Sequence, residues 1–552
     1  MHCPLILPLF IALEALGVLA QSGYAPAKVP CPAGGGSLVR TATGISDAED
    51  TYRVARKATA DEALVAWLAK TSPDFPTDGD MPALGFTVSG GGYRSMLTGA
   101  GVIQGLDARD SNTTTSGLWQ AMTYVSALSG GGWLLSSLSS NNYAPVTQVK
   151  EEMWKSGLED GLLDPGGNPL NLIRLGVEVE DKENSGFETT ITDIWGRALS
   201  VQLLPGDDDG AAVTMSGLTA LPSFANSTAP IPILTTMGVD SRDGECVPRA
   251  NGTIWEISPF EFGSRMPDIN AFVPTRVLGT TLLDGQGATG EDGCVSGFDN
   301  LGFLLGTSSS LFNFVCLPTE DIADDVAGLI GPVAATLEMF HVDTSTEQFA
   351  VVPNPFVGVD FTAATLSGDA ASNANLAEEL NLFLVDGGEG GHNTPIAPLL
   401  APERNISVLF VSDNSGDENN FPTGEQVVAQ AAIASQNPAL ASRMPKIPGE
   451  NETFADGSGR AVFYGCGEPG AITIVYLPNA AFVPGAQSNK STTQLQYSGE
   501  ETDLMVQNGV QIAGQGDDEG WGLCVACAVM KKAVAEEKLP SGCEACFGKY
   551  CV

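Results

Sequence analysis

The strongest constraint on the fold comes from residues 121–135, AMTYVSALSGGGWLL, where an apolar run meets three glycines and a second apolar run. This order predicts a buried strand, a sharp turn and a helix. Ser129 stands at the turn, with Ala127 two residues before it and Gly131 two residues after it. Small neighbours are typical of a nucleophile elbow, which exposes a serine hydroxyl at a strained strand-to-helix turn. A glycine-rich turn without chemistry has the same pattern, so both interpretations remain open at this point.

A second glycine-rich turn lies about thirty residues earlier. Residues 83–89 predict a buried strand, Gly90–Gly92 follow directly, and residues 96–106 have the apolar spacing of a helix. Bare N–H groups at a helix start favour negative charge, so this turn suits either a phosphate or the oxyanion of an attacked carbonyl. It has neither the Walker nor the GxGxxG spacing. Arg94, just beyond the glycines, could grip a phosphate with its guanidinium or be an ordinary surface arginine.

Two successive strand–turn–helix units predict neighbouring parallel strands, with both turns at the carboxyl edge of one sheet. A third apolar run, LFLV at 382–385, ends in Asp386 and is followed by two glycines. A carboxylate at a strand end could serve as a catalytic base. The same residue could equally cap its own backbone in an Asx turn.

Histidine is scarce in this chain, which contains only His2, His341 and His392. His2 belongs to the N-terminal apolar segment, and His341 lies among apolar residues and is expected in the core. His392 is close to Asp386 in sequence, so the residues themselves leave a Ser–His–Asp triad and a Ser–Asp dyad open.

The charge balance narrows the possible partners. The chain has 66 acidic and 26 basic residues, a formal net charge of −40. Such a surface repels nucleic acid and anionic membranes, so DNA and RNA are excluded as expected partners. The short acidic runs lack the ligand spacing of a calcium-binding loop, and no metal or cofactor is expected.

The N-terminus predicts export. An apolar run over residues 4–20 ends in Val18-Leu19-Ala20, a plausible signal-peptidase site before Gln21. The run is short and is interrupted by Glu14, which disfavours a membrane span. We therefore expect residues 1–20 to be a signal peptide and the mature protein to be secreted, with a buried N-terminal strand or helix as the alternative.

Cysteines and glycosylation sequons agree with export. Removal of residues 1–20 leaves an even number of cysteines, which predicts five disulfides in an oxidising compartment, with a zinc site at the two C-terminal CxxC pairs as the alternative. The ten are Cys31, Cys246, Cys294, Cys316, Cys466, Cys524, Cys527, Cys543, Cys546 and Cys551. Sequons that predict N-glycans stand at Asn112, Asn226, Asn251, Asn405, Asn451 and Asn489.

Several motifs together resemble the secreted fungal phospholipase B (lysophospholipase) family, over nearly all of the mature chain. They are SGGGYRSM at 89–96, LSGGGW at 128–133, GFDN at 297–300, GTSSSLFN at 306–313, DGGE at 386–389, and Cys543-x-x-Cys546 with Cys551. The family shares its catalytic domain with calcium-dependent cytosolic phospholipases and is distantly related to patatin.

The resemblance implies an α/β fold: a three-layer α/β/α sandwich around a central mixed, largely parallel sheet, with a nucleophile elbow and inserted peripheral cap segments. It implies a single catalytic domain over residues 21–552. We expect insertions at about 148–280 and 318–380, and a cysteine-rich end at 521–552.

The resemblance also implies hydrolysis of fatty-acyl esters of lysophospholipids and glycerophospholipids, at a membrane or micelle surface. The nucleophile would be Ser129 and the base Asp386, without a histidine. The implied oxyanion-hole residues are Gly91, Gly92 and Gly130, and the implied phosphate ligand is Arg94. Calcium dependence is not expected, because the chain has no room for the membrane-binding module of the cytosolic relatives.

Two positions depart from the family pattern: Ala127 replaces a usual glycine, and His392 stands where glutamine is more common. A methyl group in the elbow leaves one alternative function, a catalytically silent secreted glycoprotein that binds lipid or cell wall.

Local patterns give further expectations. Thr59 to Glu62 has the form of a capping box that opens a helix, whose Leu64, Trp67 and Leu68 should face the core. Residues 260–264 are expected as a loop and residues 306–313 as a helix start. Residues 318–380 are expected as peripheral helices.

Overall fold

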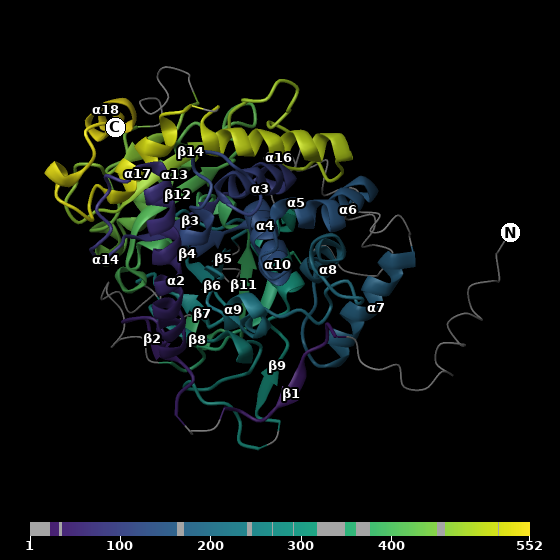
Figure 1. The fold of residues 1–552 in the computed structure, drawn as a ribbon. Coiled ribbons are helices and arrows are strands. Elements are labelled where there is room, and N and C mark those ends of the chain that lie inside the picture. The colour runs from purple at the N-terminus through teal and green to yellow at the C-terminus, as the bar shows by residue number, and fades with distance from the viewer. Residues whose placement is uncertain are drawn as a thin grey trace.

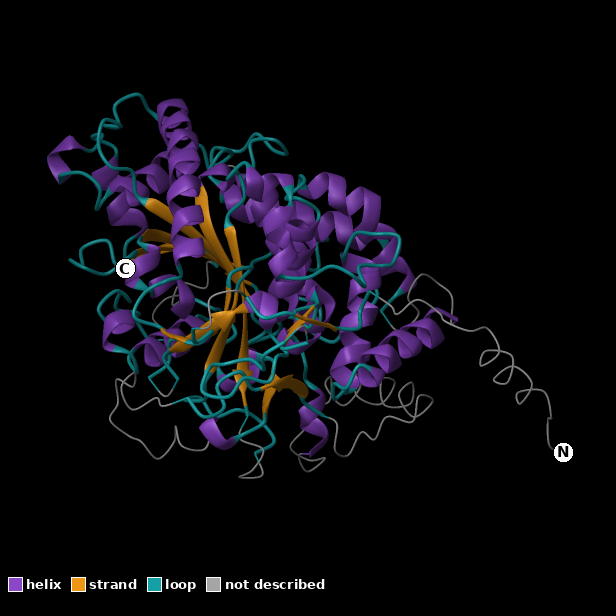
Figure 2. Ribbon diagram, turned by 90° about the horizontal axis from the view of Figure 1, so that it is seen from below, coloured by secondary structure: helices purple, strands orange, loops and turns teal. Residues whose placement is uncertain are grey.

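The computed structural model describes residues 23–32, 36–162, 170–239, 245–267, 269–290, 292–316, 348–359, 376–449, 459–516 and 518–552 (Figure 1). Their centre is a twelve-stranded mixed sheet with helices on both sides (Figure 2). Along its main path the strands are β13 (Val462–Tyr464), β14 (Thr473–Pro478), β12 (Ile406–Asp413), β3 (Ala83–Val88), β4 (Met122–Ala127), β5 (Ile231–Gly238), β6 (Ile254–Ile257), β7 (Glu261–Ser264), β8 (Ala271–Pro274) and β2 (Arg40–Thr41). Off this path, β11 (Asn381–Val385) pairs with β5 and with β10 (Ala350–Pro353). A separate small sheet joins β1 (Ala27–Val29) to β9 (Cys294–Ser296).

The parallel part of the sheet is its centre. Strands β14, β12, β3, β4 and β5 are mutually parallel, and the remaining pairs are antiparallel. The mixed α/β sheet predicted from the sequence is therefore confirmed, with parallel pairing confined to five strands. Because β3 and β4 are adjacent and parallel, their two glycine-rich turns lie at the same edge.

Helices cover both faces of this sheet. The described α-helices are α2 (Asp47–Thr71), α3 (Gly92–Leu106), α4 (Ser129–Ser140), α5 (Val146–Val149), α6 (Lys155–Asp160), α7 (Leu170–Asn184), α8 (Ile191–Leu203), α9 (Pro222–Ala225), α10 (Leu301–Ser308), α13 (Glu425–Ala434), α14 (Pro438–Ala441), α16 (Gly499–Gly514), α17 (Trp521–Met530) and α18 (Cys543–Tyr550). Alternate residues of β12 enter two different cores, Val408 and Phe410 on one face and Leu409 and Val411 on the other. Since successive side chains of a strand point to opposite faces, both faces are buried, which explains the continuously apolar central strands.

The larger core contains side chains from α2, α3, α4, α8, α10, α16 and α17, and the smaller one contains side chains from α13 and α14. Within the larger core, α16 lies along α3 (Figure 1). As a result α3 is buried almost throughout, although the sequence pattern suggested a single apolar face.

Three local predictions were wrong. The helix predicted to open at Thr59 begins at Asp47, where the Ser46 side chain accepts the Glu49 N–H at 3.2 Å. Thr59 lies inside that helix, although Leu64, Trp67 and Leu68 are buried as predicted. Residues 261–264 form strand β7 and not a loop. The alternation of polar and apolar residues that would mark a strand is hidden there, because both faces of β7 are buried.

The third wrong prediction is that of a helix start at residues 306–313. This run contains the end of α10, which begins at Leu301 under an Asn300 cap, so it is not a helix start.

The predicted insertions can be followed in part. Residues 148–280 include β5 to β8, which extend the central sheet. Much of 318–380, with His341, lies outside the described residues, but β10 within it is also a strand of the sheet.

The disulfide prediction is confirmed where the structure describes the sulfur atoms. Cys31–Cys294, Cys466–Cys551, Cys524–Cys546 and Cys527–Cys543 are bonded, and Cys246 is also disulfide-bonded. The two CxxC pairs therefore cross-link α17 to α18, which excludes the zinc alternative. Within the described part of the chain, no helix is both long and apolar enough to cross a membrane.

Candidate active site

The elbow around Ser129 has the predicted form. Strand β4 ends at Ala127, Leu128 follows in extended conformation, and α4 begins at Ser129. Ser129 has φ of 51°, a left-handed conformation that is uncommon for a residue with a side chain. Ala127 is fully buried and remains in regular strand pairing with Val88 and Leu234. The methyl group that departs from the family pattern is thus accommodated without loss of the turn.

The first glycine turn lies directly against this elbow. Gly91 and Gly92 have φ of 135° and 58°, which a residue with a side chain would adopt only with strain. A Cβ atom on Gly130 would lie 2.0 Å from the carbonyl oxygen of Gly92, so the two turns touch through bare backbone. Gly92 and Gly130 also occupy the first turns of α3 and α4, where N–H groups have no acceptor within the helix.

Asp386 faces the serine from the end of β11. Its side chain caps the short helix Gly387–Gly390 by accepting the Gly388 N–H at 2.8 Å, as an Asx turn would. The Ser129 side chain also lies against this carboxyl group, close enough to lower its pKa. The Asx turn that the sequence allowed for Asp386 is therefore confirmed, and its position beside Ser129 is compatible with the role of a base. The structure brings Ser129 and Asp386 into contact across 257 residues of sequence.

Burial governs the acidity of this carboxyl group. Ser129 and Asp386 are 5% and 4% exposed. Loss of solvation raises the Asp386 pKa to about 6, and the hydrogen bonds from Ser129 and Gly388 oppose that rise. Desolvation also raises the pKa of nearby Glu389 well above its usual value, and the charge of Asp386 adds to the effect. Burial thus disfavours the ionised form of both carboxyl groups.

His392 does not join this pair in the structure. Gln430 uses its Oε1 to accept the Ile396 N–H, so its Nε2 is the donor to His392 Nδ1, at 2.9 Å. His392 Nε2 has no hydrogen-bond partner among the described residues. Burial lowers the pKa of His392 to about 3, which keeps the ring neutral.

Arg94 is not the surface arginine that the sequence allowed. It is fully buried, and its guanidinium donates to the carbonyl oxygens of Asn414 at 3.0 Å and Lys490 at 2.6 Å. A Cβ atom on Gly91 would lie 2.7 Å from one of its Nη atoms. Arg94 is thus beside the glycine turn, where its charge is partnered by backbone carbonyls.

Sequence reasoning did not predict Ser308, Ser309 and Ser310 as site residues, yet all three contact the site. Ser308 Oγ accepts the backbone N–H of Ser129 at 3.0 Å. Ser309 Oγ accepts the indole N–H groups of Trp133 and Trp195, at 3.0 and 3.1 Å. The Ser310 carbonyl accepts the Asp386 N–H at 3.0 Å. A run of serines at a helix end has no pattern that marks such contacts, which depend on elements distant in sequence.

A small cavity of about 20 Å³ adjoins Ser129, with space for about one water molecule. Its walls are mostly apolar and come from α4, α8 and the segments after α10 and before α16. The side chains are Trp133, Trp195, Leu311, Phe312 and Leu495. Such a wall suits a hydrocarbon chain rather than a polar group.

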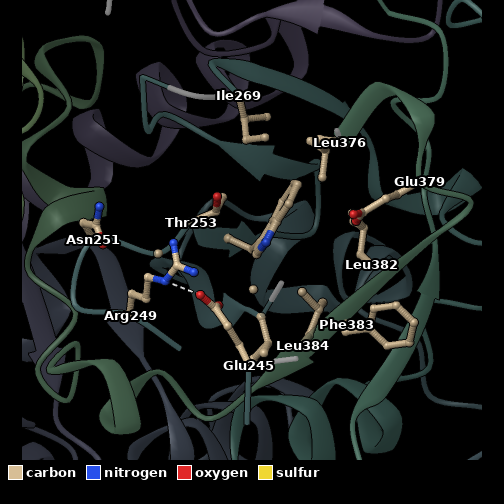
Figure 3. Close-up of a pocket in the computed structure, with 14 residues that line it drawn as sticks. Glu245, Arg249, Asn251, Thr253, Ile269, Leu376, Glu379, Leu382, Phe383 and Leu384 are labelled. Carbon is tan, nitrogen blue, oxygen red and sulfur yellow. Dashed lines mark ion pairs between the residues drawn. The ribbon is translucent and has the colours of Figure 1, made fainter. Parts of the chain in front are cut away.

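A larger pocket of about 230 Å³ lies elsewhere, among β5, β6 and β11 (Figure 3). Glu245 and Arg249, two of its lining residues, form an ion pair, and Trp255 also lines the pocket. None of the candidate catalytic residues lines this pocket. Volume alone therefore does not identify the site of chemistry in this protein.

A strained serine, a buried carboxylate and bare amides thus meet at one edge of the sheet, an arrangement typical of hydrolases with a nucleophile elbow. Residues 84–552 match a sequence model of the lysophospholipase catalytic domain. Lysophospholipase 2 of Aspergillus fumigatus is 33% identical, over 96% of this chain and 93% of that protein. Lysophospholipase 1 of Candida albicans is 35% identical, over 99% of this chain and 92% of that protein. The chain belongs to the lysophospholipase family, a family of hydrolases.

Among solved structures, the fold is similar to that of human GIVD cytosolic phospholipase A2. The TM-score is 0.67 at 18% sequence identity, and the match covers 93% of this chain and 72% of that one. At this identity the likeness concerns the fold alone, and it agrees with the mixed sheet and flanking helices described above.

Proposed function

We propose that this protein is a secreted lysophospholipase of phospholipase B type, which hydrolyses fatty-acyl esters of lysophospholipids and glycerophospholipids through a Ser129–Asp386 dyad. The observation that carries the proposal is the approach of the Ser129 side chain to the buried Asp386 carboxyl group, at a glycine-rich sheet edge. Membership of the family supports the substrate class.

In the proposed reaction, Asp386 accepts the hydroxyl proton of Ser129 as Ser129 Oγ attacks the acyl carbonyl carbon. When the tetrahedral intermediate collapses, Asp386 returns the proton to the leaving alcohol oxygen, and an acyl-serine remains. Water then attacks the acyl-serine, with Asp386 again as the base, and fatty acid is released. A carboxylate with a raised pKa is a stronger base than a solvated one, which suits this role.

The oxyanion of each intermediate would be stabilised by the backbone N–H groups of Gly91, Gly92 and Gly130. Two observations support this role for the three N–H groups. The two glycine turns are in contact, and N–H groups in the first turn of a helix have no acceptor within that helix. Loss of one such donor typically lowers the rate by about 10²–10³-fold.

Arg94 would hold the phosphate of the substrate. Its position beside Gly91 supports this role, although binding would require the phosphate to replace a carbonyl such as that of Lys490. Such an exchange is plausible because hydrogen bonds between ionised groups are stronger than those to neutral carbonyls.

Export and glycosylation belong to the same proposal. Five of the six sequon asparagines lie in the described residues, and all five side chains are exposed: Asn112, Asn226, Asn251, Asn405 and Asn489. Disulfides far apart in sequence, such as Cys31–Cys294, fit an oxidising compartment. The substrate would be met at a membrane or micelle surface.

The test is release of fatty acid from lysophosphatidylcholine by the secreted full-length chain. Ser129→Ala and Asp386→Ala should abolish release and keep the wild-type unfolding temperature within a few degrees. Labelling with a fluorophosphonate should modify Ser129 in the wild type, whereas a silent lipid-binding protein would not react. A solved structure of the human GIVD enzyme contains methyl γ-linolenyl fluorophosphonate, so reagents of this class are suitable. Full activity in folded Ser129→Ala would end the proposal.

The phosphate role of Arg94 requires a separate comparison. Arg94→Ala should lower turnover of lysophosphatidylcholine more than turnover of a short soluble ester without phosphate. An equal loss on both substrates would mean that Arg94 acts only by supporting the glycine turn.

A further inference from the structure

Ser129 has a conformation that requires support. Left-handed backbone costs a residue with a side chain on the order of 1 kcal/mol, and such strain persists only where the surroundings determine it. Ser129 is also the first residue of α4, so its N–H has no acceptor within the helix. Since this N–H is buried, a partner outside the helix is needed.

Ser308 supplies that partner from the end of α10. Its Oγ accepts the Ser129 N–H at 3.0 Å and donates its own proton to the Thr235 carbonyl of β5 at 2.8 Å. The bond to Thr235 fixes the direction of the hydroxyl proton, and therefore turns an oxygen lone pair toward Ser129. Ser308 is completely buried, so no solvent competes for these bonds.

The neighbouring hydroxyls behave differently. Thr307 and Ser309 donate to the carbonyls of Phe303 and Leu305, four residues earlier, at 2.8 and 2.7 Å. This is the usual local bond of a hydroxyl inside a helix. Ser309 also accepts indole N–H groups from α4 and α8, but Ser308 differs from both neighbours in that it donates its proton out of its own helix, to the Thr235 carbonyl of β5, so a local helical bond does not account for it.

The same segment also fixes the base. The Ser310 carbonyl accepts the backbone N–H of Asp386 at 3.0 Å, two residues after Ser308. Two residues span at most about 7 Å, so the amides of the nucleophile and the base are fixed to points a short distance apart. A shift of one relative to the other would lengthen the hydrogen bond through which Asp386 takes the serine proton.

We infer that Ser308 is a positioning residue for the reaction: by binding the Ser129 N–H it holds the elbow so that the serine hydroxyl faces Asp386 and the Gly130 N–H is left to face the substrate. This inference rests on the proposed function of Ser129. Without Ser308, the buried Ser129 N–H lacks an acceptor, and rotation of its peptide would move the hydroxyl away from the base.

The experiment measures inactivation by a fluorescent fluorophosphonate, separating the rate constant of the chemical step (kinact) from the binding constant (KI). In Ser308→Ala, kinact should fall by about 10–100-fold with KI within twofold of wild type, because misplacement of a reacting group by about 1 Å costs up to about 10²-fold. For lysophosphatidylcholine, kcat should fall and KM should change little.

The matched control is Thr307→Val, which removes an equally buried hydroxyl whose hydrogen bond, among the described residues, stays within its own helix. It should keep the wild-type kinact at a similar unfolding temperature. Ser308→Thr retains the oxygen and should recover at least a third of wild-type kinact. If Ser308→Ala does not fold, Ser308→Cys, whose thiol is a weak acceptor, takes its place.

Folded Ser308→Ala, or its Cys substitute, with kinact within twofold of wild type overturns the inference. So does an equal loss in Thr307→Val, or a folded Ser308→Thr as slow as Ser308→Ala. These outcomes are distinct from failure of the proposed function, in which Ser129→Ala itself would remain active and labelled.

Discussion

As the proposed base, Asp386 must be ionised to accept a proton, yet it is buried where ionisation is unfavourable. Desolvation raises its pKa to about 6, so protonation below that value removes the base. We expect kcat/KM on lysophosphatidylcholine to decline as the pH falls through about 6, approaching tenfold per pH unit further down. The rate of fluorophosphonate labelling should decline over the same pH range as kcat/KM.

The control for this profile is Glu389→Gln. Burial raises the Glu389 pKa well above its usual value and so favours its uncharged form, and a neutral glutamine in its place should leave the acid limb near the same pH. An activity that stays constant down to pH 4 would contradict the role of Asp386 as base.

The same shift predicts a stability gain when Asp386 is replaced by asparagine. A carboxyl group with a raised pKa binds its proton more tightly in the folded state, so its contribution to stability falls as the pH rises from about 4 to 6. At pH 7, Asp386→Asn should therefore be inactive but more stable than wild type, by up to about 3 kcal/mol. Chemical denaturation at pH 7 and pH 4 measures this difference, which should disappear at pH 4. A loss of stability at pH 7 would show that the carboxylate is held by stronger contacts than those described.

At the scale of elements, the sequence predicted the parts of the site that local patterns determine. The strands before Gly90, Ser129 and Asp386 are apolar runs that end abruptly, and glycines mark the turns where bare backbone must approach. Two such strand–turn–helix units in succession are enough to place both turns at one sheet edge, as β3 and β4 confirm.

The remaining elements depend on tertiary contacts that no local pattern records. Thr59 to Glu62 has the composition of a cap, but the helix already begins at Asp47, and tertiary packing carries it through Thr59. Ser308 was not predicted because its partners, the Ser129 N–H and the Thr235 carbonyl, come from two other elements.

The contact between α3 and α16 gives a prediction at this scale, because it depends on glycines. A Cβ atom on Gly509 of α16 would lie 2.1 Å from the Thr98 carbonyl oxygen of α3. Gly509→Ala must therefore push α16 away from the helix that begins at the Gly92 turn, at a cost of roughly 1–3 kcal/mol or more. In the same helix, Gly514→Ala meets nothing nearer than 3.9 Å and is the matched control.

Thermal unfolding and kcat for both variants check this prediction. We expect Gly509→Ala to lower the unfolding temperature and kcat together, and Gly514→Ala to leave both near wild type. Equal stability of the two variants would contradict the close packing of α3 and α16.

For the whole molecule, the exposed sequons and the disulfides are compatible with the proposed export of the chain. Mass spectrometry of tryptic glycopeptides from the secreted protein should find glycans on most of the five exposed asparagines. Replacement of Asn226 by Gln, at a site on α9's C-terminal side and away from the catalytic residues, should remove one glycan and leave kcat unchanged. Secreted protein without any occupied sequon would contradict the glycoprotein proposal.

The net charge of −40 is also a property of the whole molecule, and it predicts which lipid surfaces the enzyme can use. Repulsion from an anionic surface lowers the local enzyme concentration, and salt screens it, since the Debye length falls from about 30 Å at 0.01 M to about 3 Å at 1 M. Hydrolysis of lysophosphatidylcholine in neutral micelles should therefore slow at low ionic strength as anionic lipid is added, and should recover in high salt. A short soluble ester in the same buffers controls for direct effects of salt on the dyad. If anionic lipid at low salt left the rate unchanged or raised it, the surface that meets the lipid would have to be far less acidic than the molecule as a whole.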